Sequence, residues 1–133
     1  MTKILAIDYG EKNLGIAVTD DQGIIAIPFS VELNNERFHE ILLKIIKEKK
    51  VSKIIAGVPL NLKGQEGSQA LKAKKYFMEL SNRINMDIEL TDERFSTRIS
   101  ENKLRQRKKG NIKDIDKFAA AIILENYIGK INK

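Results

Sequence analysis

The chain has 133 residues, 42% of them apolar, a length that accommodates one domain with a hydrophobic core. It contains no cysteine and a single histidine, His39, which excludes disulfide scaffolds and thiolate chemistry and argues against histidine-based triads and multi-histidine metal sites. Lysine and arginine number 24 against 18 aspartate and glutamate residues, and this net charge of +6 favours an anionic partner such as nucleic acid.

The first quarter of the chain predicts three strands. Apolar and β-branched residues concentrate in three short runs, the last of which is interrupted by Pro28. The segments between these runs are too short for a crossover helix, so only hairpin-type turns can connect them. We therefore expect an antiparallel meander over Lys3–Asp8, Gly15–Asp20 and Gly23–Val31.

Two helices, each followed by a strand, are predicted next. Apolar residues with helical spacing follow Asn34 and Asn35, which we expect to be N-caps, and a second such helix has Ser68 as its expected N-cap. Lys53–Val58 and Met86–Thr91 predict strands that return to the sheet by parallel crossovers. The expected buried stripes are Phe38, Ile41, Leu42, Ile45 and Ile46 in the first helix, and Ala70, Ala73, Phe77, Leu80 and Ile84 in the second.

The remaining segments, 96–107 and 112–127, predict helix broken around Gly110. This order of elements predicts an α/β fold of the ribonuclease H-like class: a mixed five-stranded sheet, three antiparallel strands then two parallel ones, flanked by helices in one domain over residues 1–133. Nucleases, recombinases and the halves of actin-like ATPases share this topology, so the site residues must decide the function.

Nothing in the sequence predicts a membrane segment. The longest apolar run, Phe118–Leu124, is far shorter than the roughly 20 residues that a membrane helix needs. The N-terminal residues begin a strand pattern directly and lack the zones of a signal peptide. We expect a cytoplasmic protein.

Carboxylates follow two strands that the predicted topology brings to one sheet edge. Asp8 ends the first strand beside Gly10, and Glu93 follows the fifth strand. Because the first and fourth strands are expected to be central neighbours, with the fifth beyond the fourth, these side chains could converge. The alternatives are that Asp8 only stabilises the following turn, and that Asp92 and Glu93 cap a helix starting near Ser96.

A third carboxylate lies in the last predicted helix. Asp116 shares helical spacing with the apolar residues Ala120 and Ile123, so we expect it to point toward the sheet, where a buried carboxylate needs a partner. A first-turn aspartate favoured by the helix dipole is the alternative, and Asp114 could play that part equally well. Three oxygen ligands in a basic protein favour Mg²⁺ or Mn²⁺, and two such ions could stabilise the incoming and leaving oxygens of a phosphodiester.

Four motifs in this order resemble the YqgF family over almost the whole chain. They are 8–18 (DYGEKNLGIAV), 57–59 (GVP) with 64–67 (GQEG), 92–97 (DERFST) and 116–124 (DKFAAAIIL). The family is associated with Holliday junction resolution and with maturation of the 5′ end of the 16S ribosomal RNA precursor. The resemblance implies a cytoplasmic, ribonuclease H-like nuclease whose metal-binding catalytic triad is Asp8, Glu93 and Asp116.

The resemblance also suggests which residues hold the substrate. The stretch 98–100 departs from the small residues expected there, which leaves the local contacts open. The segment 101–113 is strongly basic and suits phosphate contacts. The candidate nucleic-acid-binding residues are Lys63, Arg94, Ser96, Thr97, Arg105, Arg107, Lys108 and Lys109.

These observations favour a Mg²⁺- or Mn²⁺-dependent nuclease acting on structured RNA, with pre-16S ribosomal RNA, and with it pre-ribosomal particles as partners, implied by the family. A Holliday junction resolvase acting on branched DNA is the alternative within enzymes, and it would require a symmetric dimer where we expect a monomer or weak homodimer. A non-catalytic nucleic-acid-binding module is a further alternative. An actin-like phosphate loop ranks low, because those ATPases clasp nucleotide between two such domains.

Overall fold

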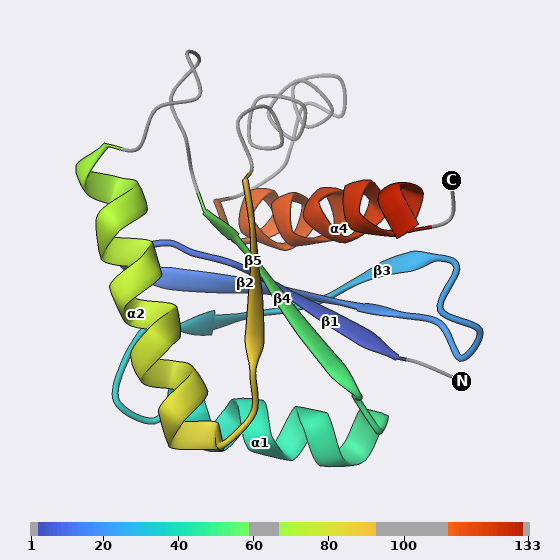
Figure 1. Cartoon of the computed structure of the whole chain (residues 1–133), viewed down its shortest axis with the longest axis horizontal. Helices are drawn as coiled ribbons and strands as arrows, with labels where there is room; N and C mark the ends of the chain where they lie inside the picture. Colours follow the sequence, from blue (N-terminus) through green and yellow to red (C-terminus); the bar gives the residue numbers. More distant parts are fainter. Residues whose placement is uncertain (1–2, 59–66, 93–111, 132–133) are drawn as a thin grey trace.

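The computed structural model describes residues 3–58, 67–92 and 112–131. Over these ranges the chain forms a mixed five-stranded sheet with helices on both faces (Figure 1). In chain order the elements are β1 (Ile4–Asp8), β2 (Asn13–Thr19), β3 (Ala26–Leu33), α1 (Phe38–Lys49), β4 (Lys53–Val58), α2 (Ser68–Ile84), β5 (Ile88–Asp92) and α4 (Ile112–Ile131).

The sheet has the predicted topology. Its strand order is β3-β2-β1-β4-β5, with β1, β2 and β3 antiparallel and with β4 and β5 both parallel to β1. The meander, the two parallel crossovers and the central position of β1 beside β4 are therefore confirmed. The carboxyl ends of β1, β4 and β5 lie at the same edge of the sheet.

Each face of the sheet carries its own hydrophobic core, because successive side chains of a strand point to opposite faces. Leu5 and Ile7 of β1 belong to the core that α1 and α2 cover, whereas Ile4 and Ala6 belong to the core that α4 covers. Figure 1 shows α1 and α2 on one side of the strands and α4 on the other. The central strand is therefore apolar at every position until Asp8.

The predicted helical stripes of α1 and α2 are confirmed. Phe38, Leu42 and Ile45 of α1 are buried, and Ile41 and Ile46 pack against them. Burying a large apolar side chain stabilises the fold by about 1.5–3 kcal/mol, so each stripe fixes its helix on the sheet. The five expected residues of α2 are all buried, namely Ala70, Ala73, Phe77, Leu80 and Ile84.

Helix α4 covers the second core and extends four residues further than predicted, to Ile131. Ala119 and Ala120 are at most 1% exposed, and such small side chains allow the helix axis to approach the sheet closely. The Lys53 ammonium lies 5.0 Å from the centre of the Tyr127 ring at the far end of this contact.

Among the described residues, no helix has the length and apolar character needed to cross a membrane.

The expected N-caps are wrong. The N-cap of α1 is Arg37 and that of α2 is Gly67, and neither makes a side-chain capping hydrogen bond. Asn34 and Asn35 stabilise the turn before α1 instead, because the Asn35 side chain accepts a 2.9 Å hydrogen bond from the Arg37 amide. Ser68 is the first helical residue of α2.

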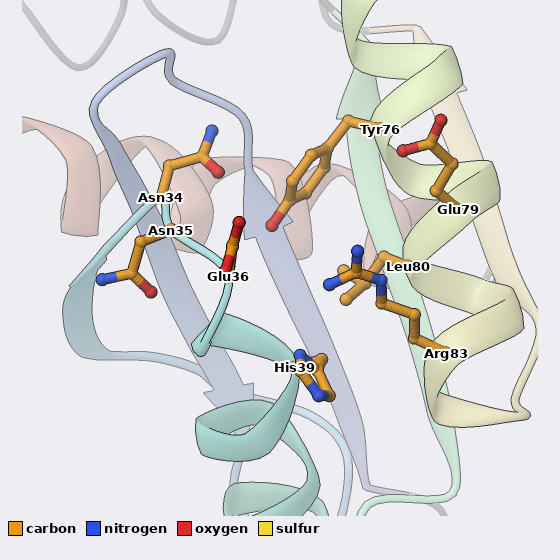
Figure 2. A pocket seen from close by; sticks show the side chains of 8 residues that line it. All are labelled: Asn34, Asn35, Glu36, His39, Tyr76, Glu79, Leu80 and Arg83. Atoms are coloured by element: carbon orange, nitrogen blue, oxygen red, sulfur yellow. The ribbon is translucent and has the colours of Figure 1, made fainter.

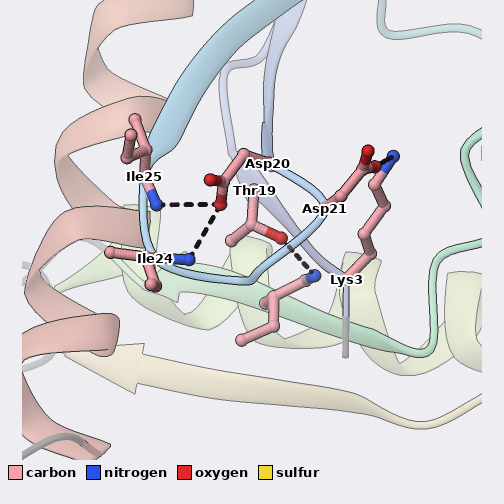
Figure 3. A network of polar contacts seen from close by, with 7 residues as sticks. Lys3, Thr19, Asp20, Asp21, Ile24 and Ile25 are labelled. Atoms are coloured by element: carbon pink, nitrogen blue, oxygen red, sulfur yellow. Dashed lines mark hydrogen bonds and ion pairs between the residues drawn. The ribbon is translucent and has the colours of Figure 1, made fainter. Parts of the chain in front are cut away.

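Two predicted strands are shifted toward the C-terminus, and the cause of the first shift is visible in the β2–β3 turn (Figure 3). The Asp20 carboxylate accepts hydrogen bonds of 2.9 and 3.1 Å from the amides of Ile24 and Ile25, so β3 starts at Ala26 rather than Gly23. These bonds also lower the pKa of Asp20 below its usual 3.8. The fifth strand begins at Ile88 rather than Met86.

A buried threonine fastens the start of β1. The Thr19 hydroxyl oxygen accepts a 3.0 Å hydrogen bond from the backbone amide of Ile4, and its side chain is 1% exposed (Figure 3). Beside it, the exposed Asp21 carboxylate pairs with the Lys3 ammonium at 3.0 Å. The turn between β2 and β3 is thereby tied to the first residues of the sheet.

Candidate active site

Asp8 occupies the last position of β1, at the edge where three parallel strands end. It is in register with Gly57 of β4, which in turn is in register with Thr91 of β5. Gly57 contributes no side chain between its neighbours, and the Thr91 hydroxyl lies 3.4 Å from the carbonyl oxygen of Ala56. At this edge β4 therefore places no side chain between Asp8 of β1 and Thr91 of β5.

Strand alternation assigns each of these side chains to a face. Asp8 is in phase with Ile4 and Ala6, which pack against α4, so it lies on the α4 face. Asp92 is in phase with Ile88, which packs against the core under α1 and α2. Of the expected acidic pair after the fifth strand, Asp92 therefore belongs to the face opposite Asp8.

The segment after Asp8 is held from two directions. The side-chain amide of Asn34 donates a 2.9 Å hydrogen bond to the carbonyl oxygen of Gly10, and the backbone amide of Asn34 donates to the Lys12 carbonyl at 2.9 Å. The Tyr9 ring lies 5.4 Å from the Tyr76 ring of α2, measured between centres. A side chain at position 10 would collide with the backbone oxygen of Asn13, which explains the glycine.

Sequence reasoning missed Tyr9 and Asn34 as residues that position this turn. The glycine pattern after Asp8 indicated a tight turn, but the partner that fixes it lies 24 positions later in the chain. Asn34 was interpreted as a helix cap because asparagine before an apolar stripe usually has that role. Only the pairing of β2 with β3 brings it next to Gly10.

The other two predicted triad residues are described in part or not at all. Position 116 lies in α4, four residues before Ala120 and seven before Ile123, both fully buried against the sheet. Asp114 has the same spacings to Phe118 and Ala121, and Ala121 belongs to the same buried core, so spacing alone does not separate the two aspartates. Side chains are described in α4 only from Phe118 onward, and Glu93 lies outside the described residues.

The predicted nucleic-acid-binding residues also lie outside the described ranges. They are Lys63, Arg94, Ser96, Thr97, Arg105, Arg107, Lys108 and Lys109. Within residues 3–58, 67–92 and 118–131, no three histidine, aspartate or glutamate side chains form a group that could hold a metal ion. The described part of the candidate site is thus Asp8, the glycine beside it and the face that α4 covers.

The donor chemistry at this edge fits a hard cation. Asp8 supplies carboxylate oxygens at a partly exposed position, and oxygen ligands are those that Mg²⁺ and Mn²⁺ prefer. The neighbouring Gly57 adds no side chain beside Asp8 at this edge. A strand-end carboxylate on the same face as a packed helix is a suitable position for one member of an acidic metal site.

Comparison with known proteins links this geometry to a family. A family model described as "RuvX: Holliday junction resolvase" matches residues 2–130. A protein of Sulfurihydrogenibium sp. (strain YO3AOP1), described as "Putative pre-16S rRNA nuclease", is 42% identical over 135 residues, which cover 99% of this chain and 93% of that protein. A protein of Fusobacterium nucleatum subsp. nucleatum with the same description is 37% identical, covering 96% of this chain and 97% of that protein.

Solved structures support the fold. RuvC of T. thermophilus, in complex with a Holliday junction substrate, matches with a TM-score of 0.58 at 10% identity, covering 98% of this chain and 96% of that one. The fowlpox virus resolvase, in complex with Holliday junction DNA, matches with a TM-score of 0.55 at 13% identity, covering 99% and 100%. The RuvC-like, ribonuclease H-like fold is confirmed, and the match over residues 2–130 together with the full-length relatives shows that the chain belongs to the RuvX/YqgF family.

Proposed function

We propose that this protein is a metal-dependent nuclease that hydrolyses phosphodiester bonds and processes the 5′ end of pre-16S ribosomal RNA. Full-length relatives at 37–42% identity are described as nucleases of that precursor. The observation that carries the proposal is the position of Asp8, which ends the central strand in register with Gly57 and on the face that α4 covers. A carboxylate at this position can hold a metal ion next to a phosphodiester group of an RNA that binds at the sheet edge.

The proposed catalytic and metal-binding triad is Asp8, Glu93 and Asp116. Asp8 lies on the face of the sheet that α4 covers, and position 116 is part of α4. Glu93 is the residue that follows β5 in the chain, and Asp92 before it belongs to the opposite face, which favours Glu93 as the ligand. Asp116 begins the motif 116–124 that resembles the family, and we therefore prefer it to Asp114.

The three carboxylates would hold Mg²⁺ or Mn²⁺. When bound, such ions stabilise the charge that develops on the attacking and leaving oxygens of the phosphodiester. Asp8 has the role of a ligand with a fixed direction, because its strand is buried on both faces and the turn after it is fastened by Asn34 and Tyr9. The acidic residues need not transfer protons themselves.

The proposed phosphate contacts come from the basic residues of the chain. Because the net charge is +6, an extended RNA backbone would be attracted at long range before any specific contact forms. We assign the contacts to Lys63 in the glycine-containing segment after β4, to Arg94, Ser96 and Thr97 after Glu93, and to Arg105, Arg107, Lys108 and Lys109.

The test is cleavage of labelled pre-16S leader RNA by wild type, Asp8→Asn and the matched control Asp21→Asn, with Mn²⁺, Mg²⁺ or a chelator. Asp21 is an exposed turn carboxylate that pairs with Lys3 away from Asp8, so its replacement leaves the site intact. We expect wild type and Asp21→Asn to cut equally, and Asp8→Asn to lose more than about a hundredfold in rate, since even residues that only support metal ligands cost 10–100-fold. Binding of RNA without metal-dependent cutting would instead identify a non-catalytic binding module.

A second candidate function is resolution of Holliday junctions. The family description and the fold shared with two junction-bound resolvases favour it. A resolvase cuts two strands symmetrically and requires a dimer. Cutting of a four-way DNA junction by a dimeric protein would support this candidate, whereas RNA-selective cutting by a monomer would exclude it.

A further inference from the structure

A polar pocket lies between the N-terminal end of α1 and the C-terminal half of α2, away from the face that carries Asp8. Its volume is about 250 Å³. Figure 2 shows the side chains of Glu36, Tyr76 and Arg83 directed toward one another across it. The lining residues are Asn34, Asn35, Glu36, His39, Tyr76, Glu79, Leu80 and Arg83.

The charged side chains of this pocket, Arg83, Glu36 and Glu79, form no ion pair with one another in the part of the chain that the structure describes. The Nδ1 atom of His39 is buried with no hydrogen-bond partner among the described residues. Burial raises the pKa of Tyr76 to about 12, so its hydroxyl is a neutral donor at physiological pH.

The charges of the pocket exclude a simple phosphate site. Two carboxylates and one guanidinium line the pocket, so a phosphate would meet net repulsion. A planar, uncharged ligand with both donors and acceptors on its edge fits better, because Tyr76 and Leu80 offer ring and apolar contact while Glu36 and Arg83 offer complementary hydrogen bonds. A nucleobase has this combination of properties.

We infer that this pocket binds an unstacked nucleobase of single-stranded RNA, with guanine as the preferred base. A carboxylate such as that of Glu36 can accept from both N1–H and the N2 amine of guanine, and the Arg83 guanidinium can donate to O6 or N7. Adenine would place its N1 acceptor against one carboxylate oxygen. Cytosine and uracil each offer a single donor at the corresponding edge.

The pocket is joined to the candidate active site by two shared residues. Tyr76 contacts Tyr9, the residue after Asp8, and Asn34 bonds the Gly10 carbonyl. A base held there would therefore rest on the same side chains that fix the turn following Asp8. The inference relies on the proposed function for the polymer that carries the base, but base binding itself does not depend on cleavage.

His39 makes a direct test possible because it is the chain's one histidine and gives a single set of imidazole NMR signals. The full-length protein, in metal-free buffer with chelator, is titrated with GMP, AMP, CMP, UMP and, as a phosphate control, ribose 5-phosphate. We expect saturable shifts of the His39 signals with GMP, at lower concentration than with the other nucleotides, and no shift with ribose 5-phosphate.

Variants separate the pocket from non-specific binding. Glu36→Gln should weaken GMP binding about tenfold, within the range known for a good bidentate base contact, and leave AMP binding unchanged. Glu48→Gln, an exposed carboxylate elsewhere on α1, is the matched control and should change nothing. Both positions are exposed, so neither variant should affect folding.

Three results would overturn the inference: His39 signals that no nucleotide moves, equal shifts from ribose 5-phosphate, or GMP binding that Glu36→Gln leaves intact. A protein that cleaves RNA but gives one of these results would contradict the base pocket alone. A protein that binds GMP in the pocket but cleaves nothing would contradict the nuclease proposal alone.

Discussion

The side-chain amide of Asn34 donates its hydrogen bond to the carbonyl oxygen of Gly10, two residues after Asp8, and so ties the β1–β2 turn to the start of α1. The direction of the Asp8 carboxylate depends on the backbone that follows it. This turn is built from both ends: Tyr9 is packed on α2, and Gly10 is held from the β3–α1 junction.

Replacing Asn34 should affect both stability and activity. Asn34→Ala removes a part-buried hydrogen bond and should lower the free energy of unfolding by about 1 kcal/mol. The turnover number of RNA cleavage should fall further than KM rises, because the loss acts through the direction of Asp8. Urea unfolding and steady-state kinetics measure these effects. Asn82→Ala, on the exposed side of α2, is the control; equal kinetics in the two variants would contradict the positioning role.

Two glycines should respond in opposite directions to alanine. At position 10 the new methyl group collides with a backbone oxygen, so Gly10→Ala should lower the free energy of unfolding by about 1–3 kcal/mol, the usual range for a forced backbone shift. At position 129, inside α4, the new carbon meets no atom within 4 Å apart from the helix's own neighbouring residues, so Gly129→Ala should raise the free energy of unfolding by about 0.5–1 kcal/mol through helix propensity. Denaturant titration of both variants measures these changes. A free energy of unfolding that shifts in the same direction in both variants would refute the interpretation.

Thr19 should tolerate serine better than valine. Valine keeps the shape but leaves the buried Ile4 amide without an acceptor, which costs about 1–3 kcal/mol. Serine keeps the oxygen and loses only a methyl group. Thermal or urea unfolding of Thr19→Val and Thr19→Ser gives the comparison, and a valine variant as stable as wild type would show that the hydrogen bond contributes little.

The fold should lose stability at alkaline pH through Tyr76. Burial, and secondarily the charge of Tyr9, raises the pKa of Tyr76 from 10.0 to about 12 against an opposing effect of Arg83. Because the folded state holds this proton more tightly than the unfolded chain, the stabilisation is complete below pH 10 and is lost as the pH rises toward 12. Unfolding curves across that interval should show the decline in wild type and a smaller decline in Tyr76→Phe. Identical slopes in both proteins would contradict the assignment.

The two aspartates at the start of α4 should differ in activity. Asp116→Asn should lose metal-dependent cleavage because Asp116 is the proposed third ligand, whereas Asp114→Asn should retain most of it. Cleavage of the leader RNA and circular dichroism of both variants provide the measurement. The reverse order of activities would move the third ligand to Asp114.

The sheet was predictable because its signals are local and strong. The short breaks after Asp8 and Asp20 force a meander, and the apolar stripes of α1 and α2 predict the buried residues correctly. The caps could not be predicted from neighbours in sequence alone. Asn34 has a distant partner, Gly10, and Gly67 starts α2 where Ser68 had the favourable propensity.

The candidate site was predicted in part for a similar reason. Asp8 was recognisable as a charge that ends an apolar central strand, and strand pairing places it at the expected edge. The pocket around Tyr76 and Arg83 had no such signal, since its residues come from the turn before α1, from the first turn of α1 and from α2, and polar residues are ordinary beside the apolar stripe of a helix.

The position of α4 in the chain has a consequence for synthesis. Between Ala120 and Ile128 the helix supplies one side of the second core, packed with Ile4, Ala6 and Ala17, which precede it in the chain. During translation β1, β2 and β3 can pair with one another, but their α4 face stays uncovered until residue 131 has left the ribosome. Because the proposed ligand Asp116 arrives with the same helix, completion of the core and assembly of the metal site would be one event, and a nascent chain would carry no nuclease activity before release of this segment.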